Sequence, residues 1–185
     1  MTRTLLIGGA RSGKSAYAEE LATSSSASGK QVIYVATAQS GDAEMAQRIA
    51  RHRQRRDAVW LTVEEPIELG AAIEKYSKPD TVLLIDCLTV WLSNLLFSEK
   101  IDFPEVGTIA PPACFYTQRA ALLQALAQAQ GDVILVTNEV GQGIVPQGAV
   151  SRWFVDEAGR LNQAVAAACE RAVMTVAGLP LTLKG

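Results

Sequence analysis

Gly8-Gly9-Ala10-Arg11-Ser12-Gly13-Lys14-Ser15 matches the pattern G-x-x-x-x-G-K-[ST] of a phosphate-binding loop at every fixed position. Glycines at positions 8 and 13 allow backbone conformations that a Cβ disfavours, so that successive N–H groups can surround phosphate oxygens. Lys14 brings a positive charge to the outer phosphates, and Ser15 offers a hydroxyl to Mg²⁺. The loop therefore predicts a site for a nucleoside triphosphate.

The sequence on either side of this loop fits a strand before it and a helix after it. Thr4-Leu5-Leu6-Ile7 is a short apolar run of the kind found in buried strands. Downstream, Tyr17, Ala18, Leu21 and Ala22 recur at the spacing of one helix face. A glycine turn that matched by chance would not be expected between these two patterns, so we interpret the match as functional.

The composition describes a protein of one compact domain. The chain has 185 residues, of which 49% are hydrophobic, and we expect a single nucleotide-binding domain over 1–185. A formal net charge of −2 provides no general attraction to nucleic acid. Cys87, Cys114 and Cys169 are odd in number and widely spaced, which argues against a disulfide framework or a zinc site and favours a reducing, cytoplasmic location. There is no signal-peptide pattern and no apolar run of about 18 residues, so we expect no membrane span.

Strand-like and helix-like patterns alternate through the rest of the chain. Further strands are expected at 31–35, 59–63, 81–86, 132–137, 173–176 and 181–183, and helices at 42–56, 87–97, 113–130 and 151–171, with a short helix after residue 66. The small residues at 23–29 and the proline-containing stretch at 98–112 are interpreted as connections. The alternation predicts an α/β protein with a three-layer P-loop NTPase fold of the RecA-like type and a mainly parallel central sheet.

Three stretches are expected at the ligand-binding edge of that sheet, where parallel strands end. Ala36-Thr37-Ala38 follows the second strand, and residues 138–146, polar and then glycine-rich, follow a later one. Asp86 ends an apolar run, which is the Walker B pattern of a carboxylate that holds Mg²⁺ directly or through water. We favour this role for Asp86 over that of a helix N-cap, because a carboxylate in such a place is costly without a cation or donors.

The helix predicted at 42–56 carries five arginines around His52, the only histidine of the chain. The arginines are Arg48, Arg51, Arg53, Arg55 and Arg56, and Met45 and Ile49 form an apolar stripe beside Glu44, Arg48, His52 and Arg56. Charge runs are usually solvated faces, and this one lacks the interleaved aromatic residues of a nucleic-acid patch. The functional interpretation is an arginine-lined phosphate site, in which neutral imidazole attacks phosphorus and carries a nucleotidyl group.

Six stretches, taken in this order, resemble one enzyme family. They are the phosphate loop, Tyr34-Val35-Ala36-Thr37-Ala38, Glu44-Met45 with Arg48-Ile49 and His52-Arg53, Asp86-Cys87-Leu88-Thr89, Val136-Thr137-Asn138-Glu139-Val140-Gly141 and Gly159-Arg160-Leu161-Asn162-Gln163. Together they resemble the bifunctional adenosylcobinamide kinase / adenosylcobinamide-phosphate guanylyltransferases of cobalamin biosynthesis, over nearly the whole chain. The resemblance favours the functional interpretation of His52, because this family carries covalent GMP on the histidine at that place.

The resemblance implies two reactions. ATP or GTP phosphorylates the hydroxyl of the aminopropanol arm of adenosylcobinamide; His52 then takes GMP from GTP and passes it to adenosylcobinamide phosphate, giving adenosylcobinamide-GDP. The implied nucleotide contacts are Gly8, Gly9, Ala10, Arg11, Ser12, Gly13, Lys14, Ser15, Ala36, Thr37, Ala38, Arg53, Gln54, Arg55, Arg56, Glu64 and Asp86, with Ser15 and Asp86 as ligands of Mg²⁺. Whether Glu64 and Asp86 contact guanine, ribose or metal stays open at this point. The family also implies a homo-oligomer, with a trimer as the expected form.

Two other functions are compatible with parts of the sequence. A plain small-molecule P-loop kinase would use the phosphate loop without a covalent intermediate, and His52→Ala would then spare its activity. A RecA-related ATPase or binding module would contact nucleic acid through the arginine-rich helix, and its binding would fall steeply with salt. The six stretches together favour the bifunctional enzyme.

Overall fold

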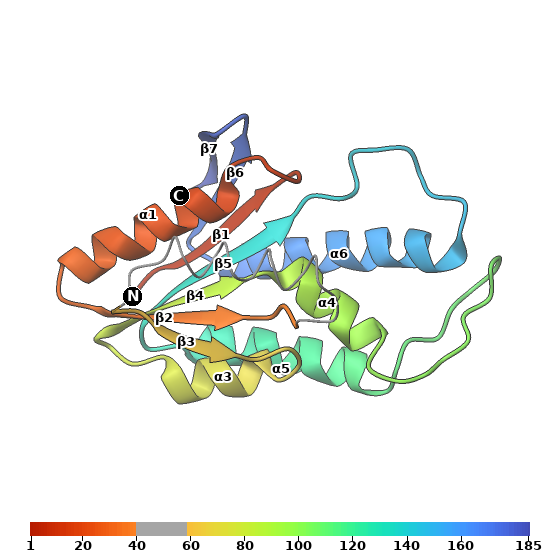
Figure 1. Ribbon diagram of the computed structural model, residues 1–185, viewed down its shortest axis with the longest axis horizontal. Helices are drawn as coiled ribbons and strands as arrows, with labels where there is room; N and C mark the ends of the chain where they lie inside the picture. Colours follow the sequence, from red (N-terminus) through yellow and green to blue (C-terminus); the bar gives the residue numbers. More distant parts are fainter. Residues whose placement is uncertain (40–58) are drawn as a thin grey trace.

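A computed structural model describes residues 1–39 and 59–185, and within them seven strands form one sheet in the order β3-β2-β4-β5-β1-β6-β7 (Figure 1). The strands are β1 (Arg3–Gly8), β2 (Gln31–Ala36), β3 (Leu61–Glu64), β4 (Thr81–Asp86), β5 (Asp132–Asn138), β6 (Arg171–Val176) and β7 (Leu179–Lys184). The helices are α1 (Lys14–Ala27), α3 (Leu69–Tyr76), α4 (Leu88–Leu96), α5 (Cys114–Gln128) and α6 (Ala149–Ala168). This is the predicted alternation of strands and helices, with several boundaries shifted.

The sheet is parallel from β3 to β6, and β7 pairs antiparallel with β6 at one edge. β5 lies between β1 and β4, so the strand that ends at the phosphate loop and the strand that ends at Asp86 are not neighbours. Because parallel strands end at the same edge of a sheet, the residues that follow β1, β2, β3, β4 and β5 gather at one edge. We call this the carboxyl edge.

Helices cover both faces of the sheet, as Figure 1 shows with α1 on one face and α3, α5 and α6 on the other. Consecutive strand residues supply the two faces: Leu5 belongs to the larger apolar cluster, under α3 to α6, and Leu6 to the smaller one, which includes Ala18 and Ala22 of α1. Each fully buried leucine of this kind contributes about 1.5–3 kcal/mol by leaving water. The three-layer arrangement and the mainly parallel sheet are therefore confirmed.

The first helix extends further than the sequence indicates. We expected residues 23–29 to connect α1 to β2, but α1 continues to Ala27. The hydroxyls of Thr23, Ser24 and Ser25 donate to the carbonyl oxygens four residues earlier, at 2.8, 2.9 and 3.1 Å. This local hydrogen bonding lets serine and threonine occupy a helix whose sequence alone favours a turn.

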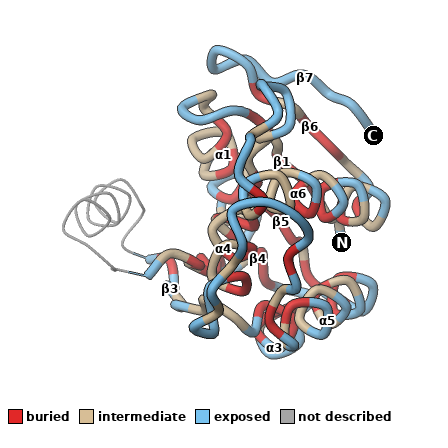
Figure 2. Tube along the Cα trace, turned by 90° about the vertical axis from the view of Figure 1, so that its right-hand side faces the viewer, coloured by how far each residue is buried: buried red, intermediate tan, exposed pale blue. Residues whose placement is uncertain are grey.

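Two other boundaries differ because of pairing in the sheet. The helix predicted at 151–171 runs from Ala149 to Ala168, because Arg171 pairs with Thr4 and belongs to β6. The strand predicted at 59–63 begins at Leu61, the residue that pairs with Ile33. β7 is exposed along its whole length, as Figure 2 shows by its colour.

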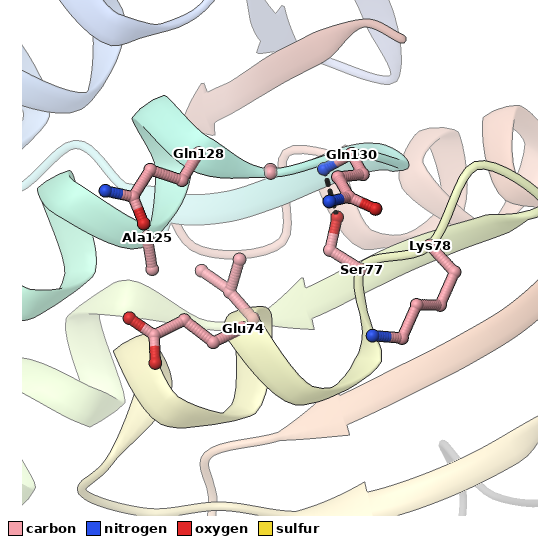
Figure 3. Close-up of a pocket in the computed structure, with 8 residues that line it drawn as sticks. Glu74, Ser77, Lys78, Ala125, Gln128 and Gln130 are labelled. Atoms are coloured by element: carbon pink, nitrogen blue, oxygen red, sulfur yellow. Dashed lines mark hydrogen bonds between the residues drawn. The ribbon is translucent and has the colours of Figure 1, made fainter.

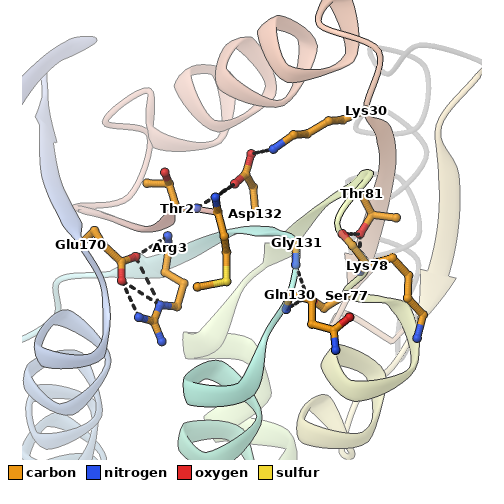
Figure 4. Close-up of polar contacts among 11 residues, drawn as sticks. Thr2, Arg3, Lys30, Ser77, Lys78, Thr81, Gln130, Gly131, Asp132 and Glu170 are labelled. Atoms are coloured by element: carbon orange, nitrogen blue, oxygen red, sulfur yellow. Dashed lines mark hydrogen bonds and ion pairs between the residues drawn. The ribbon is translucent and has the colours of Figure 1, made fainter.

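Polar contacts close the opposite edge of the sheet, where the strands begin (Figure 4). The Glu170 carboxylate accepts from the backbone N–H of Arg3 at 2.6 Å and also binds its guanidinium group. Asp132 accepts from the N–H of Thr2 at 2.7 Å and pairs with Lys30. These contacts hold the starts of β1 and β5 to neighbouring segments, on the side away from the phosphate loop.

In the described part of the chain, every helix is too short or too polar to cross a lipid bilayer.

Candidate nucleotide site

The phosphate loop lies at the end of β1 and leads directly into α1. Gly13 stands just before the helix with φ 98°, a left-handed conformation that glycine adopts without a steric penalty. Arg11 also has a positive φ, of 57°, and the N–H of Ser12 donates to the carbonyl of Gly9 at 3.2 Å. This tight turn leads directly into the helix that starts at Lys14, which is the geometry that the sequence pattern predicts for a phosphate-binding loop.

The loop rests on the hairpin of β6 and β7, a contact that sequence reasoning missed. The N–H of Gly178 donates to the carbonyl of Ser12 at 2.8 Å, and the hydroxyls of Ser12 and Thr175 lie 2.8 Å apart. A Cβ at Gly8 would come within 2.5 Å of Ser12 Oγ and 2.6 Å of the Thr175 carbonyl. Gly8 is thus required by close packing. The hairpin supports the loop although Ser12 and Gly178 lie 166 positions apart in the sequence.

Lys14 has its ammonium group inside the loop. Its Nζ donates to the carbonyl oxygen of Gly9 at 3.0 Å, and the residue is only 8% exposed. Burial lowers the pKa of Lys14, while the nearby Cys87 and Asp86 act in the opposite direction. Within residues 1–39 and 59–185, the buried ammonium group has one hydrogen-bond acceptor, the Gly9 carbonyl. It is therefore well placed to exchange that carbonyl for phosphate oxygens.

Asp86 ends β4 at the carboxyl edge, as predicted. Its Oδ2 accepts a hydrogen bond from the hydroxyl of Tyr34 at 3.0 Å. Ala36 pairs with Asp86 on one side and with Glu64 on the other, so the ends of three adjacent strands bring both predicted carboxylates to the same edge. Asp86 is not a helix N-cap, because Cys87 occupies that position before α4. The structure thus places Asp86 where a Walker B carboxylate is expected.

Thr37 is fully buried and bonds within the protein. Its hydroxyl donates to the carbonyl of Cys87 at 2.9 Å and accepts from the N–H of Cys87 at 2.8 Å. Asn94 of α4, for which no sequence pattern indicates a role, donates to the carbonyls of Thr37 and Pro66 at 2.8 and 3.1 Å. Thr37 therefore ties β2 to β4, and its contact with a nucleotide stays a prediction, as do those of Ala36 and Ala38.

Burial makes Cys87 an unreactive thiol beside Asp86. Its side chain is 8% exposed, and burial, with a smaller effect of the Asp86 charge, raises the pKa of Cys87 to about 11. All three cysteines are free. Cys87 is thus a packing residue of the site.

A cluster of polar side chains holds the end of β5 beside the phosphate loop. Asn138 pairs with Gly8, and its N–H donates to Thr89 Oγ1 at 2.7 Å. The Thr137 hydroxyl donates to Asn162 Oδ1 at 2.9 Å, and Asn162 Nδ2 lies 3.4 Å from the carbonyl of Asn138. The family-like stretches that contain Thr89, Thr137 and Asn162 thus meet in space, a contact that no local sequence pattern indicates.

Part of the predicted site lies outside the described residues. These residues are His52, Arg53, Gln54, Arg55 and Arg56, with Glu44, Met45, Arg48, Ile49 and Arg51 of the same predicted helix. Their roles stay predictions. Glu64, at the end of β3, is exposed at the carboxyl edge.

A separate hollow of about 200 Å³ lies at the opposite end of the sheet (Figure 3). It lies between the end of α3 and the segment that joins α5 to β5, and Glu74, Ser77, Lys78, Gln128 and Gln130 are among its lining residues. The residues that line it precede the strands, so it is remote from the phosphate loop. Ser77 Oγ there accepts from the N–H groups of Gln130 and Gly131 at 2.9 and 2.8 Å, which makes its role structural.

The chain is similar to known proteins over nearly its whole length. Residues 4–183 match the family model described as cobinamide kinase / cobinamide phosphate guanyltransferase. The bifunctional adenosylcobalamin biosynthesis protein CobP of Pseudomonas aeruginosa is 50% identical over 183 residues, covering 99% of this chain and 98% of that protein. The protein CobU of Escherichia coli, with the same description, is 42% identical, covering 97% and 98%.

Among solved structures, the flagellar accessory protein FlaH of Methanocaldococcus jannaschii aligns with a TM-score of 0.55. The alignment covers 99% of this chain and 78% of FlaH at 13% identity, so the likeness concerns the fold alone. The phosphate loop, the carboxylate at the end of β4 and the full-length match to the family agree with one another. The chain therefore belongs to the cobinamide kinase / cobinamide phosphate guanyltransferase family of transferases.

Proposed function

We propose that this chain carries out two consecutive transfers on adenosylcobinamide. In the first, ATP or GTP gives its γ-phosphoryl group to the hydroxyl of the aminopropanol arm. In the second, GMP passes from GTP through His52 to adenosylcobinamide phosphate, and adenosylcobinamide-GDP is formed. The observation that carries the proposal is the phosphate loop with buried Lys14, in a chain that matches the family over residues 4–183.

The phosphate loop accounts for the first reaction. Its N–H groups and the start of α1 bind the phosphates, and the Lys14 ammonium moves from the Gly9 carbonyl to the outer phosphate oxygens. Charge that builds on these oxygens during transfer is then stabilised by donors already in place. The loop therefore both binds the nucleotide and lowers the barrier to transfer.

His52 would carry out the second reaction. Its imidazole attacks the α-phosphorus of GTP, pyrophosphate leaves, and the phosphoramidate then gives GMP to the phosphate of the acceptor. Arg53, Arg55 and Arg56, with Gln54, are the proposed contacts that neutralise charge on the nucleotide. The support for this step is the position of His52 in the family-like stretch Glu44-Met45 to His52-Arg53.

Mg²⁺ fits the oxygen donors of the site. The Ser15 hydroxyl lies in the first turn of α1, and Asp86 Oδ2 accepts from Tyr34 while Oδ1 has no hydrogen-bond partner among the described residues. Mg²⁺ prefers such hard oxygen donors together with phosphate oxygens and water. When bound, the ion would neutralise phosphate charge. Ser15 and Asp86 would hold Mg²⁺, and Glu64 would contact guanine or ribose.

We also propose a homo-oligomer, with a trimer as the expected form, acting in the cytoplasm. The support is the resemblance to the family, and the three free thiols agree with a reducing compartment. No nucleic-acid partner is proposed, since the net charge of −2 gives no general attraction to a polyanion.

The test is to incubate the protein with adenosylcobinamide, Mg²⁺ and GTP and to follow the acceptor by mass spectrometry. The proposal predicts an added phosphoryl group first and an added GMP unit later, and Lys14→Ala should lose both. An acceptor that gains only a phosphoryl group would identify a plain kinase. An acceptor of unchanged mass, under conditions where GTP binds, would reject both reactions.

A further inference from the structure

A glutamate that the proposed mechanism does not use lies against the phosphate loop. Glu139 directly follows β5, and its N–H donates to the carbonyl oxygen of Gly8 at 3.0 Å. The next loop residue, Gly9, accepts from Lys14 Nζ at 3.0 Å. The backbone N–H of Glu139 and the Lys14 ammonium group therefore contact adjacent residues of the phosphate loop.

The carboxylate of Glu139 is oriented through one of its oxygens. Oε1 accepts from the N–H of Gly141 at 2.7 Å, and a Cβ at Gly141 would lie 3.1 Å from this oxygen. Among the described residues, Oε2 has no hydrogen-bond partner and no cation forms an ion pair with Glu139. The side chain is half-buried, so this second oxygen remains available to a bound molecule.

The backbone that carries Glu139 is fixed from three sides. The preceding residue, Asn138, is held by the Thr89 hydroxyl at 2.7 Å and by the Asn162 amide at 3.4 Å, and it pairs with Gly8. A catalytic group needs this kind of support, because a small displacement from the reacting atoms removes most of its effect.

We propose that Glu139 is a further catalytic residue, which takes the proton of the acceptor hydroxyl in the first reaction. The proposal rests on the proposed function. As the hydroxyl oxygen forms its bond to the γ-phosphorus, the proton passes to the Glu139 carboxylate. The bond between the γ-phosphorus and the bridging oxygen breaks, and the nucleoside diphosphate leaves with the electron pair. Glu139 later releases the proton to water.

The second reaction gives Glu139 no such task. The attacking group there is the phosphate of adenosylcobinamide phosphate, which is already an anion and has no hydroxyl proton that must be removed. Asp86, another carboxylate at the carboxyl edge, is the proposed ligand of Mg²⁺ and accepts from Tyr34 through Oδ2. The two reactions should therefore differ sharply in their need for Glu139.

The test compares Glu139→Gln with the wild-type protein in each reaction separately. The amide keeps the shape of the side chain but cannot accept the proton. We expect the kcat of phosphorylation to fall about 10²- to 10⁴-fold with little change in the KM for the nucleotide. Transfer of GMP to separately prepared adenosylcobinamide phosphate should keep its wild-type rate, and Glu139→Asp should recover part of the phosphorylation.

Glu74→Gln is the matched control, because it makes the same carboxylate-to-amide change on α3, at the opposite end of the sheet. It should leave both reactions unchanged. Wild-type kcat for phosphorylation in Glu139→Gln would overturn the inference, and so would equal loss of both reactions with weaker GTP binding, which indicates a structural role. Failure of the wild-type protein to phosphorylate the acceptor would instead reject the proposed function, and the inference with it.

Discussion

The ammonium group of Lys14 donates to the carbonyl oxygen of Gly9 across 3.0 Å, inside a loop shaped to hold phosphate. The lysine is buried, and burial lowers its pKa, so the charge is held there at a cost to the folded protein. An anion that enters the loop relieves this cost. We therefore propose that Lys14 serves nucleotide binding more than stability.

Replacing Lys14 by Met should separate these two effects. We expect the melting temperature without nucleotide to stay the same or rise, because a buried charge is replaced by an apolar side chain of similar length. The rise in melting temperature on adding Mg²⁺ and GTP should disappear, and kcat/KM for phosphorylation should fall about 100-fold or more. Thermal unfolding with and without GTP measures both effects. A wild-type response to GTP in this variant would contradict the assignment.

Gly8→Ala and Gly9→Ala form a matched pair in the same loop. A Cβ at Gly8 would lie 2.5 Å from Ser12 Oγ and 2.6 Å from the Thr175 carbonyl, whereas a Cβ at Gly9 would meet nothing within 4 Å. Urea unfolding should therefore show a loss of about 1–3 kcal/mol for Gly8→Ala. The loss for Gly9→Ala should stay within about 0.5 kcal/mol. Equal losses would show that close packing is not the reason for glycine at position 8.

Thr89→Val tests the support of the β5 end. It keeps the shape of the side chain but removes the oxygen that accepts from the N–H of Asn138 at 2.7 Å. Leaving this N–H without a partner should lower the free energy of unfolding by about 1–3 kcal/mol. Thr89→Ser, which keeps the hydroxyl, should lose less. If the methyl group of Thr89 were the stabilising part instead, Thr89→Ser would lose more free energy of unfolding than Thr89→Val.

Acid should weaken the contact between Arg3 and Glu170. Hydrogen bonds from Arg3 to the Glu170 carboxylate lower the pKa of Glu170 from the ordinary 4.5 to about 2. Because the folded-state pKa is lower than the unfolded one, the contact stabilises the protein fully above about pH 5 and loses this effect as the pH falls from about 4.5 toward 2. The Glu170 side chain is 43% exposed, so the gain is about 1 kcal/mol or less.

The matching measurement is urea unfolding of the wild-type protein and Glu170→Gln at pH 7 and pH 4. The difference between the two proteins should be larger at pH 7. A difference that grows as the pH falls would contradict the assigned pKa.

The sequence predicted those parts of the fold and site that depend on local patterns. The strand that precedes the phosphate loop and the apolar run that ends at Asp86 both depend on local patterns, and the structure confirms them. Contacts between distant segments carried no local signal. Gly178 supports Ser12, and Asn162 supports Asn138, only because the sheet order places β6 and β5 on either side of β1.

Residues 23–27 were predicted wrongly for a related reason. Composition marks a serine-rich stretch as a connection, but hydroxyl groups that bond to the preceding helical turn allow α1 to continue. Such bonds depend on whether a helix already leads into the stretch. Residue composition does not record this.

The covalent intermediate on His52 is the central claim, and one labelling experiment tests it most directly. The protein is incubated with Mg²⁺ and GTP labelled at the α-phosphate, and protein-bound label is tested for loss in acid and retention in alkali, as expected of a phosphoramidate. His52 is the only histidine, so its replacement by Ala removes every imidazole from the chain. We predict label on the wild-type protein and none on His52→Ala. Absence of label on wild-type protein that binds GTP, or label that persists in His52→Ala, would contradict the covalent mechanism.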